Sequence, residues 1–221
     1  ESKSRILQSL AKNSSSLVAT SKLIAGSLSH HARVESAHAF MREHANGFPV
    51  VLKPDAGERG AGVAVIRSEA ELSDYLNSHV NVIIQEYVGG FEFGVFYYRH
   101  PDCQTGRIFS ITRKQFPCVI GDGTHTLENL ILKDNRAVCM AHVYFDAQRD
   151  RLWSVPGKDE AVQLIEIGTH CRGCVFLDGD DVKTAALEAA IDRVARGFDG
   201  FYFGRFDIRT PSLARFSQGK N

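Results

Sequence analysis

A lysine followed by a glycine-rich segment is the stretch of this sequence best suited to phosphate chemistry. Lys53 ends the apolar run 50–52, and Gly57, Gly60 and Gly62 follow closely. Glycine allows backbone conformations that other residues avoid, so several N–H groups can converge on one anion. A glycine-rich loop alone would indicate only a flexible turn, but an ammonium beside it suits a polyphosphate. No Gly-Lys-Ser/Thr follows and the next element reads as a strand, which excludes a P-loop and a dinucleotide fingerprint.

A second group of candidate residues follows an apolar strand pattern. Residues 84–88 (Ile-Gln-Glu-Tyr-Val) lead into Gly89-Gly90, and Glu92 comes shortly after. A purine nucleoside needs an apolar slot, a backbone donor–acceptor pair and an acceptor for the ribose hydroxyls. Tyr87 and Val88 can provide the first two and Glu92 the third. Alone, Glu92 would be read as a surface residue of a strand.

A third group, Arg205 and Asp207, lies in the strand-like segment Gly-Arg-Phe-Asp-Ile-Arg. Alternation along a strand points both side chains to one face. Alone, the pair would be read as a salt bridge. Beside a phosphate-binding loop, it suggests a metal ligand and a partner that stabilises charge.

A mixed α+β chain is expected to position these residues. Helical periodicity and capping residues predict helices over residues 5–11, 33–44, 68–76, 127–132 and 184–196. Apolar runs bounded by turn residues predict strands over residues 50–52, 63–66, 82–87, 91–99, 107–112, 118–119 and 201–208. Gly89-Gly90 marks a lobe boundary. We therefore expect lead-in helices in residues 1–46, a small lobe in residues 47–90 and a large lobe in residues 91–221.

Composition limits the classes of partner. Lys plus Arg and Asp plus Glu number 26 each, so no bulk field attracts nucleic acid or an anionic membrane. The apolar runs are far shorter than the roughly 20 residues of a membrane helix. Five scattered cysteines favour free thiols in a reducing, cytoplasmic compartment. The sequence begins at Glu1 without methionine or signal peptide and stops at Asn221 without a closing element, so we expect a fragment.

Cys171 and Cys174, in the segment His-Cys-Arg-Gly-Cys, raise the alternative of a zinc site. No second ligand pair occurs at a zinc-site spacing. A polar loop with two buried thiols is the simpler interpretation.

Taken in order, the three groups resemble the ATP-grasp superfamily. The matching motifs are Phe-Pro-Val-Val-Leu-Lys-Pro with its glycine-rich loop, Gln-Glu-Tyr-Val with Glu92, and Gly-Arg-Phe-Asp. The stretch 114–117 leading to Gly-Asp-Gly-Thr-His-Thr-Leu at 121–127 is similar to one in cyanophycin synthetases, and D-alanine–D-alanine ligases are also similar in style. The resemblance covers residues 48–209. It implies an α+β ATP-grasp fold, two lobes with antiparallel sheets that grip a nucleotide, and the cofactors ATP and Mg²⁺.

The resemblance also implies a nucleotide-binding set. Its members are Lys53 at the α- and β-phosphates, Gly60, Ala61, Gly62 and Val63 over the β/γ end, Gln85, Tyr87 and Val88 along the adenine, and Glu92 at the ribose. Glu86 is also in the nucleotide-binding set. The ligase branch often has an acidic residue where this sequence has Gln85, but an amide can still read the adenine amino group.

For catalysis, the resemblance implies Arg205 at the transferring group and Lys114 near the γ-phosphate. It also implies Asp207 as a Mg²⁺ ligand and Arg172 as a candidate for an acceptor carboxylate. The family follows its Arg-x-Asp strand with a Glu-x-Asn pair that completes the metal site. This sequence ends before such a pair, so Asp207 is expected to be a poor Mg²⁺ site by itself.

The function implied is an ATP-dependent carboxylate–amine (or thiol) ligase that acts through an acyl phosphate. Its partners would be a small-molecule carboxylate and an amine, with neither nucleic acid nor membrane, and a homodimer is left open. Two alternatives are a nucleotide-binding module without catalysis and a small-molecule kinase on the same fold.

Overall fold

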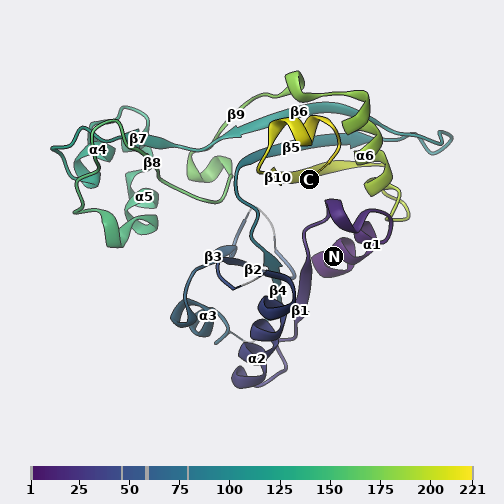
Figure 1. Cartoon of the computed structure of the whole chain (residues 1–221), viewed down its shortest axis with the longest axis horizontal. Helices are drawn as coiled ribbons and strands as arrows, with labels where there is room; N and C mark the ends of the chain where they lie inside the picture. The colour runs from purple at the N-terminus through teal and green to yellow at the C-terminus, as the bar shows by residue number, and fades with distance from the viewer. Residues whose placement is uncertain (1, 46, 58–59, 79, 221) are drawn as a thin grey trace. The chain divides into compact units, whose positions relative to one another are not determined.

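The computed structural model describes residues 2–45, 47–57, 60–78 and 80–220 (Figure 1). The chain forms two compact units, Glu1–Thr112 with Asp178–Asn221, and Arg113–Leu177. The α-helices are α1 (Lys3–Ser14), α2 (His30–Phe40), α3 (Glu69–Tyr75), α4 (Leu127–Lys133), α5 (Ala141–Ala147), α6 (Ala185–Ala195) and α7 (Leu213–Ser217). The strands are β1 (Ser21–Ile24), β2 (Val50–Pro54), β3 (Ala64–Ile66), β4 (Val82–Glu86), β5 (Phe91–Tyr98), β6 (Arg107–Gln115), β7 (Cys118–Ile120), β8 (Ala161–Gln163), β9 (Val175–Asp178) and β10 (Phe203–Thr210). Within the described ranges, no helix combines the length and apolar character needed to cross a bilayer.

The first sheet of the larger unit has the strand order β1-β4-β2-β3 with antiparallel pairs throughout. Val50 and Leu52 of β2 are fully buried, whereas the alternate residues Val51 and Lys53 are partly exposed. This alternation gives the sheet one face in the core and one face that carries Lys53. Strand β1 was not predicted, because a four-residue strand with two apolar residues is too short to show alternation.

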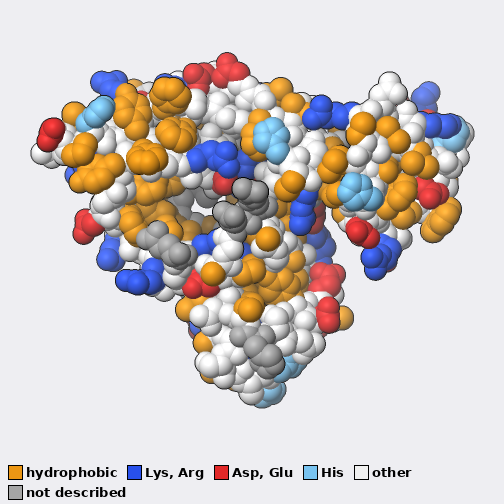
Figure 2. Space-filling view, turned by 180° about the vertical axis from the view of Figure 1, so that it is seen from behind, with side chains coloured by type: hydrophobic (Ala, Val, Ile, Leu, Met, Phe, Trp, Pro, Cys, Tyr) orange, Lys and Arg blue, Asp and Glu red, His pale blue; other side chains and the backbone are white. Residues whose placement is uncertain are grey.

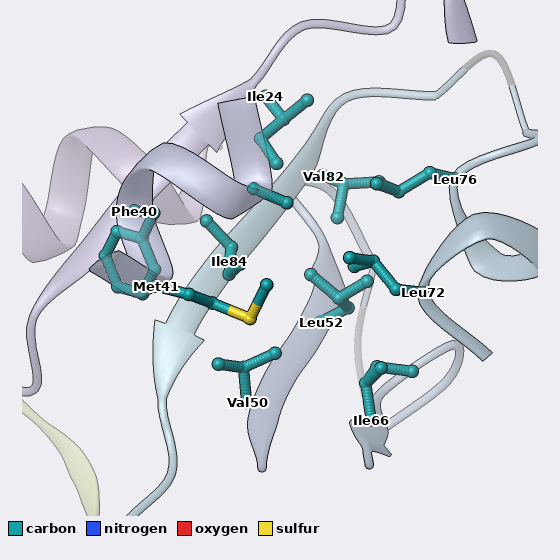
Figure 3. Packing of buried hydrophobic residues seen from close by; sticks show 11 residues of the cluster. Ile24, Phe40, Met41, Val50, Leu52, Ile66, Leu72, Leu76, Val82 and Ile84 are labelled. Carbon is teal, nitrogen blue, oxygen red and sulfur yellow. The ribbon is translucent and has the colours of Figure 1, made fainter. Parts of the chain in front are cut away.

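Helices α2 and α3 cover the apolar face of this sheet (Figure 3). Phe40 of α2, Leu72 of α3, and Leu52 and Ile84 of the sheet all have exposed fractions of 1% or less. Burying each such side chain contributes roughly 1.5–3 kcal/mol. The predicted helix from Ser68 is confirmed by its cap. The Ser68 hydroxyl accepts the Glu71 N–H at 3.3 Å.

Helix α1 is tied to the end of β2 by Asp55. The Ser4 N–H donates to Asp55 Oδ1 at 2.8 Å, and the Lys3 N–H donates to the Asp55 carbonyl at 3.1 Å. Burial acts to raise the pKa of Asp55, but hydrogen bonds from Ser4 and Ser2 outweigh it and leave the pKa below its usual value. The N-terminal helix is therefore fixed beside the segment that leads into the glycine-rich loop.

The second sheet has the order β10-β5-β6-β9. Phe93 of β5 stacks on Phe216 of α7 at 4.7 Å between ring centroids, and Ile191 of α6 belongs to the same core. The alternate residues of β5 and β10 lie on the opposite face. We call this the site face; it carries Glu92, Gly94, Phe96 and Tyr98 of β5 and their register partners Arg209, Asp207, Arg205 and Phe203 of β10.

The smaller unit has its own core. Strands β7 and β8 pair antiparallel, and the core joins Val119 and Val162 of this pair to Leu127 of α4 and Tyr144 of α5. Residues 123–125 form a bend after β7. The helix predicted over residues 127–132 is α4, and the Thr126 hydroxyl caps it by accepting the Asn129 N–H at 3.3 Å.

Candidate functional site

Lys53 and Gln85 meet on the face of the first sheet that is turned away from the core. The Lys53 ammonium donates to Gln85 Oε1 at 2.5 Å. Burial, and to a smaller extent the charge of Lys3, lower the pKa of Lys53 from its ordinary 10.5 to about 8. A bound anion would favour the charged ammonium and relieve this cost. The structure thus brings together two residues that the sequence analysis assigned to one nucleotide.

Lys3 is a candidate that the sequence analysis missed. Its ammonium donates to the Pro54 carbonyl at 3.2 Å, and a Cβ placed on Gly57 would lie 3.9 Å from its Nζ. Lys3 and Lys53 therefore put two ammonium groups at the start of the glycine-rich loop, which suits a polyphosphate. No local motif marks Lys3, because only the packing of α1 against Asp55 brings it here.

The glycine-rich loop connects β2 to β3, and its far end is held by specific contacts. Gly60, Ala61 and Gly62 form a turn in which the Val63 N–H donates to the Gly60 carbonyl at 3.2 Å. Gly62 has φ +70°, and a Cβ there would lie 2.7 Å from Pro54 Cγ. Only glycine fits this backbone without displacing Pro54.

Tyr75 of α3 adds a second restraint, since its hydroxyl donates to the Gly62 carbonyl at 2.5 Å. The four predicted loop residues 60–63 thus form a positioned turn. Residues 58 and 59 of the same loop lie outside the described residues.

The segment after β4 connects the two sheets. Glu86 has a structural partner, because its Oε1 accepts the Thr20 N–H at 2.7 Å and its own N–H donates to the Thr20 carbonyl at 3.0 Å. Tyr87 and Val88 are half-buried. The adenine roles of Tyr87 and Val88 and the nucleotide-binding role of Glu86 stay predictions, and the Glu86 carboxylate also anchors the chain in front of β1.

Glu92 is buried in an ion pair with Arg209. Arg209 reaches Glu92 Oε2 through Nε at 3.0 Å and Nη2 at 2.9 Å, and its guanidinium lies 5.9 Å from the Tyr87 ring centroid. Arg209 was not in the predicted set, although strand alternation already placed it on the face of Arg205. The ribose role of Glu92 stays a prediction in which Arg209 shares the carboxylate.

Arg205 and Asp207 lie on the site face, as the alternation predicted. Arg205 Nε is 3.5 Å from Asp207 Oδ1, and the two side chains are 49% and 53% exposed. Gly94 makes room for this arrangement, since a Cβ there would lie 3.1 Å from Arg205 Cδ. The absence of a side chain at Gly94 lets the arginine lie flat on β5.

Asp207 fits Mg²⁺ as one ligand of several. Across the described ranges, no group of three or more His, Cys, Asp or Glu side chains is placed to hold a metal. Mg²⁺ in nucleotide sites is held by one or two carboxylates together with phosphate oxygens and water. The donor set present therefore suits a Mg²⁺ that arrives with phosphate.

The smaller unit holds the remaining predicted residues, Lys114 and Arg172. Lys114 is buried, with Nζ 5.8 Å from the Phe176 ring centroid. Arg172 lies in the one-turn helix His170–Arg172, and the tilted rings of His170 and Phe176 have centroids 3.8 Å apart. Both cations are thus in one unit, and their roles stay predictions.

The expectation of two buried thiols in the Cys-x-x-Cys loop is wrong for one of them. Cys174 is buried and Cys171 is exposed, because Gly173 in the left-handed region ends the turn between them.

The turn after β7 carries a chain of polar side chains. Asp122 accepts the His125 N–H at 2.8 Å and lies 2.5 Å from His125 Nδ1, and His125 Nε2 lies 2.6 Å from Lys133 Nζ. Hydrogen bonds from His125 and Thr124 hold the pKa of Asp122 well below its usual value. This turn lies in the segment whose sequence is similar to cyanophycin synthetases, and that resemblance implied no role for it.

Comparison with solved structures identifies the fold. The chain is similar to D-alanine–D-alanine ligase from Bacillus anthracis, with a TM-score of 0.51 and 12% identity over 95% of this chain and 52% of that chain. It is similar to the VanG D-Ala:D-Ser ligase from Enterococcus faecalis, with a TM-score of 0.51 and 13% identity over 95% of this chain and 48% of that chain. The chain has the ATP-grasp fold.

The ATP-grasp assignment rests on structure alone. No protein-family model matches the sequence, and no match is found among curated proteins. The chain spans about half the length of the two ligases above. The predicted α+β class with antiparallel sheets is confirmed.

Proposed function

We propose that this ATP-grasp chain is the ATP-binding part of an ATP-dependent carboxylate–amine (or thiol) ligase. The observation that carries the proposal is Lys53, whose pKa is lowered to about 8 beside the glycine-rich loop. A partly buried ammonium with a second one, that of Lys3, close by is electrostatically prepared for a polyphosphate. The similarity to ligases of known structure supports the reaction class.

The chemistry follows from the poor leaving group of a carboxylate. One carboxylate oxygen attacks the γ-phosphorus of ATP, the bond to the β-phosphate oxygen breaks, and ADP leaves. The resulting acyl phosphate is attacked at carbon by an amine, inorganic phosphate leaves, and the amine gives up a proton. The protein's share is positioning and charge stabilisation.

Each site residue has a task in this scheme. Lys53, Lys3 and the loop hold the phosphates, and Arg205 balances charge on the transferring phosphoryl group. When bound, Mg²⁺ supplies charge neutralisation on the phosphate oxygens, with Asp207 among its ligands. We propose Lys114 near the γ-phosphate and Arg172 for a carboxylate carried by the acceptor amine.

We propose a reducing cytoplasm as the compartment, since the five cysteines, all of them within the described residues, form no disulfide.

The test measures nucleotide binding and turnover separately. Titration calorimetry with ADP establishes binding, and ADP release is then followed with pools of carboxylic acids, with and without amines. Amine-dependent release of ADP supports the ligase. A stable phosphorylated product formed without amine would replace it with a kinase, and nucleotide binding with no turnover in any pool would leave a binding module.

A further inference from the structure

The site face of the second sheet continues past Arg205 into an exposed group of aromatic rings. We call this group the aromatic platform; it consists of Phe96, Tyr98, Phe109 and Phe203. Phe109 is 70% exposed, Phe203 is 74% exposed and Phe96 is 36% exposed. Figure 2 shows hydrophobic side chains gathered at the upper left, where the second sheet lies. A contiguous patch of exposed apolar side chains usually marks a binding site for a ligand or for another protein.

Strand register makes the platform and the charged part of the site one continuous surface. Phe96 is the register partner of Arg205, and Tyr98 is the register partner of Phe203. The Phe96 and Phe109 rings meet edge to face at 6.0 Å, and Tyr98 meets Phe109 at 6.5 Å. Directly opposite residues of an antiparallel pair have Cβ atoms about 5 Å apart. A ring on Phe96 and an anion on Arg205 are therefore within reach of one small molecule.

A pocket of about 650 Å³ opens beside the platform and helps to place the ligand. Its lining includes Tyr98 and Phe109 of the platform together with Lys183 and Glu188 near the start of α6. Glu188 already accepts the Ile108 N–H at 3.0 Å and lies 3.8 Å from Arg107 Nη1. The charged lining suits a polar substituent, so an apolar ring is better placed on Phe96 and Phe109.

We propose that the aromatic platform binds the side chain of the carboxylic acid substrate, so that the preferred acid carries an aromatic ring. The carboxylate lies at Arg205, next to the phosphate end of the site, and the ring packs on Phe96 and Phe109. A spacer of two or three carbons connects the two positions. Charge complementarity with Arg205 selects an acid, and aromatic packing selects a ring. This inference rests on the proposed ligase function and specifies its substrate class.

The experiment uses 3-phenylpropanoate as the probe and ligand-observed NMR titration as the measurement. The unmodified chain is expected to bind the probe more tightly than butanoate, which lacks the ring, and than 3-phenylpropanamide, which lacks the charge. Phe109→Ala should weaken binding about three- to tenfold, in line with the loss of one aromatic pair. Arg205→Gln should weaken it about tenfold or more, through loss of a charge-assisted contact.

Trp153→Ala is the matched control, because Trp153 is an equally exposed aromatic residue (75%) in the other unit. It should leave the affinity for the probe unchanged. Equal affinities of the unmodified chain and of Phe109→Ala for 3-phenylpropanoate would overturn the proposal. Equal affinities of the unmodified chain for 3-phenylpropanoate and 3-phenylpropanamide would overturn it as well. The proposal would also be overturned if the unmodified chain is a dimer in sedimentation equilibrium and Phe109→Ala is a monomer. That result would assign the platform to contact with a second copy of the chain.

An ADP titration of the same samples separates this inference from the function on which it rests. ADP binding without selective binding of 3-phenylpropanoate would remove the substrate class and leave the nucleotide site. Selective binding of the acid without ADP binding would remove the proposed function and leave an aromatic acid site.

Discussion

The first and second sheets present their candidate residues in contrasting electrostatic environments. On the first sheet, Lys53 is partly buried beside Lys3, and its pKa is lowered to about 8. On the second sheet, Arg205 and Asp207 are each about half exposed and lie 3.5 Å apart. Exposed ion pairs contribute about 0–1 kcal/mol, whereas a buried ammonium costs free energy until an anion arrives. The first sheet is therefore suited to binding an anion at Lys53. On the second sheet, Arg205 and Asp207 can separate at little cost and reorient around a reacting group.

Removing Lys53 should have the largest effect on nucleotide affinity. A charge-assisted contact of this kind is worth roughly 1.5–3 kcal/mol, so Lys53→Ala should weaken ADP binding about tenfold to a hundredfold in a calorimetric titration. Lys22→Ala on neighbouring β1 is the control, since Lys22 is exposed and pairs in register with the core residue Ile84. Equal affinities of Lys53→Ala and the parent would remove Lys53 from the site.

Substituting Gly62 tests whether the loop of the first sheet is as rigid as its contacts indicate. Gly62→Ala combines a left-handed backbone, costing about 1–2 kcal/mol, with a clash against Pro54, costing about 1–3 kcal/mol. Gly200→Ala is the matched control, because φ is +81° and nothing lies within 4 Å of the added Cβ. In urea unfolding, Gly62→Ala should lose clearly more free energy of unfolding than Gly200→Ala. Similar losses in both would show that Pro54 yields easily.

The lowered pKa of Lys53 predicts proton uptake on nucleotide binding near pH 9. Free Lys53 is mostly neutral at that pH, and a bound phosphate raises its pKa, so the complex should take up as much as about one proton. Calorimetry in two buffers with different ionisation heats measures this number. Lys53→Arg should abolish the uptake, because arginine stays charged. Identical binding heats in both buffers at pH 9 would contradict the assignment.

The same pKa sets the sign of a stability change in the free protein. The folded-state pKa, about 8, lies below the ordinary 10.5, so between these values the unfolded chain binds more protons. The free energy of unfolding should therefore increase as the pH rises from about 8 toward 10.5, which means that the folded protein becomes more stable. That increase should be missing in Lys53→Ala, as measured by urea unfolding at pH 7.5 and pH 10.

The smallest effect is expected at Asp207 on the second sheet. Asp207→Asn should remove the part of ATP affinity that depends on Mg²⁺. Metal-free binding should stay nearly unchanged, because without a cation the carboxylate repels the phosphates and contributes no attraction that the substitution could remove. Its exposed ion pair with Arg205 limits the loss of stability to about 0–1 kcal/mol. Asp199→Asn, at an exposed position before β10, is the control. A loss of stability with the Mg²⁺ effect intact would assign Asp207 to the salt bridge alone.

Local patterns in the sequence determined most of the helices and strands. They also determined which side chains share one face of a strand. Alternation in Gly-Arg-Phe-Asp-Ile-Arg placed Arg205 and Asp207 on one face, and the Ser68 and Thr126 caps located the starts of α3 and α4. These features depend on neighbours within a few residues, so short-range sterics and hydrogen bonding are sufficient to predict them.

Only the tertiary structure decided which distant residues share a site. Lys3 reaches the glycine-rich loop because Asp55 fixes α1, and Arg209 binds Glu92 because β10 pairs with β5 in a particular register. The depressed pKa of Lys53 likewise comes from burial and from Lys3, neither of which a local pattern encodes. Burial and long-range pairing depend on the whole packed chain, so the electrostatic state of the site follows from the fold and cannot be read from its motifs.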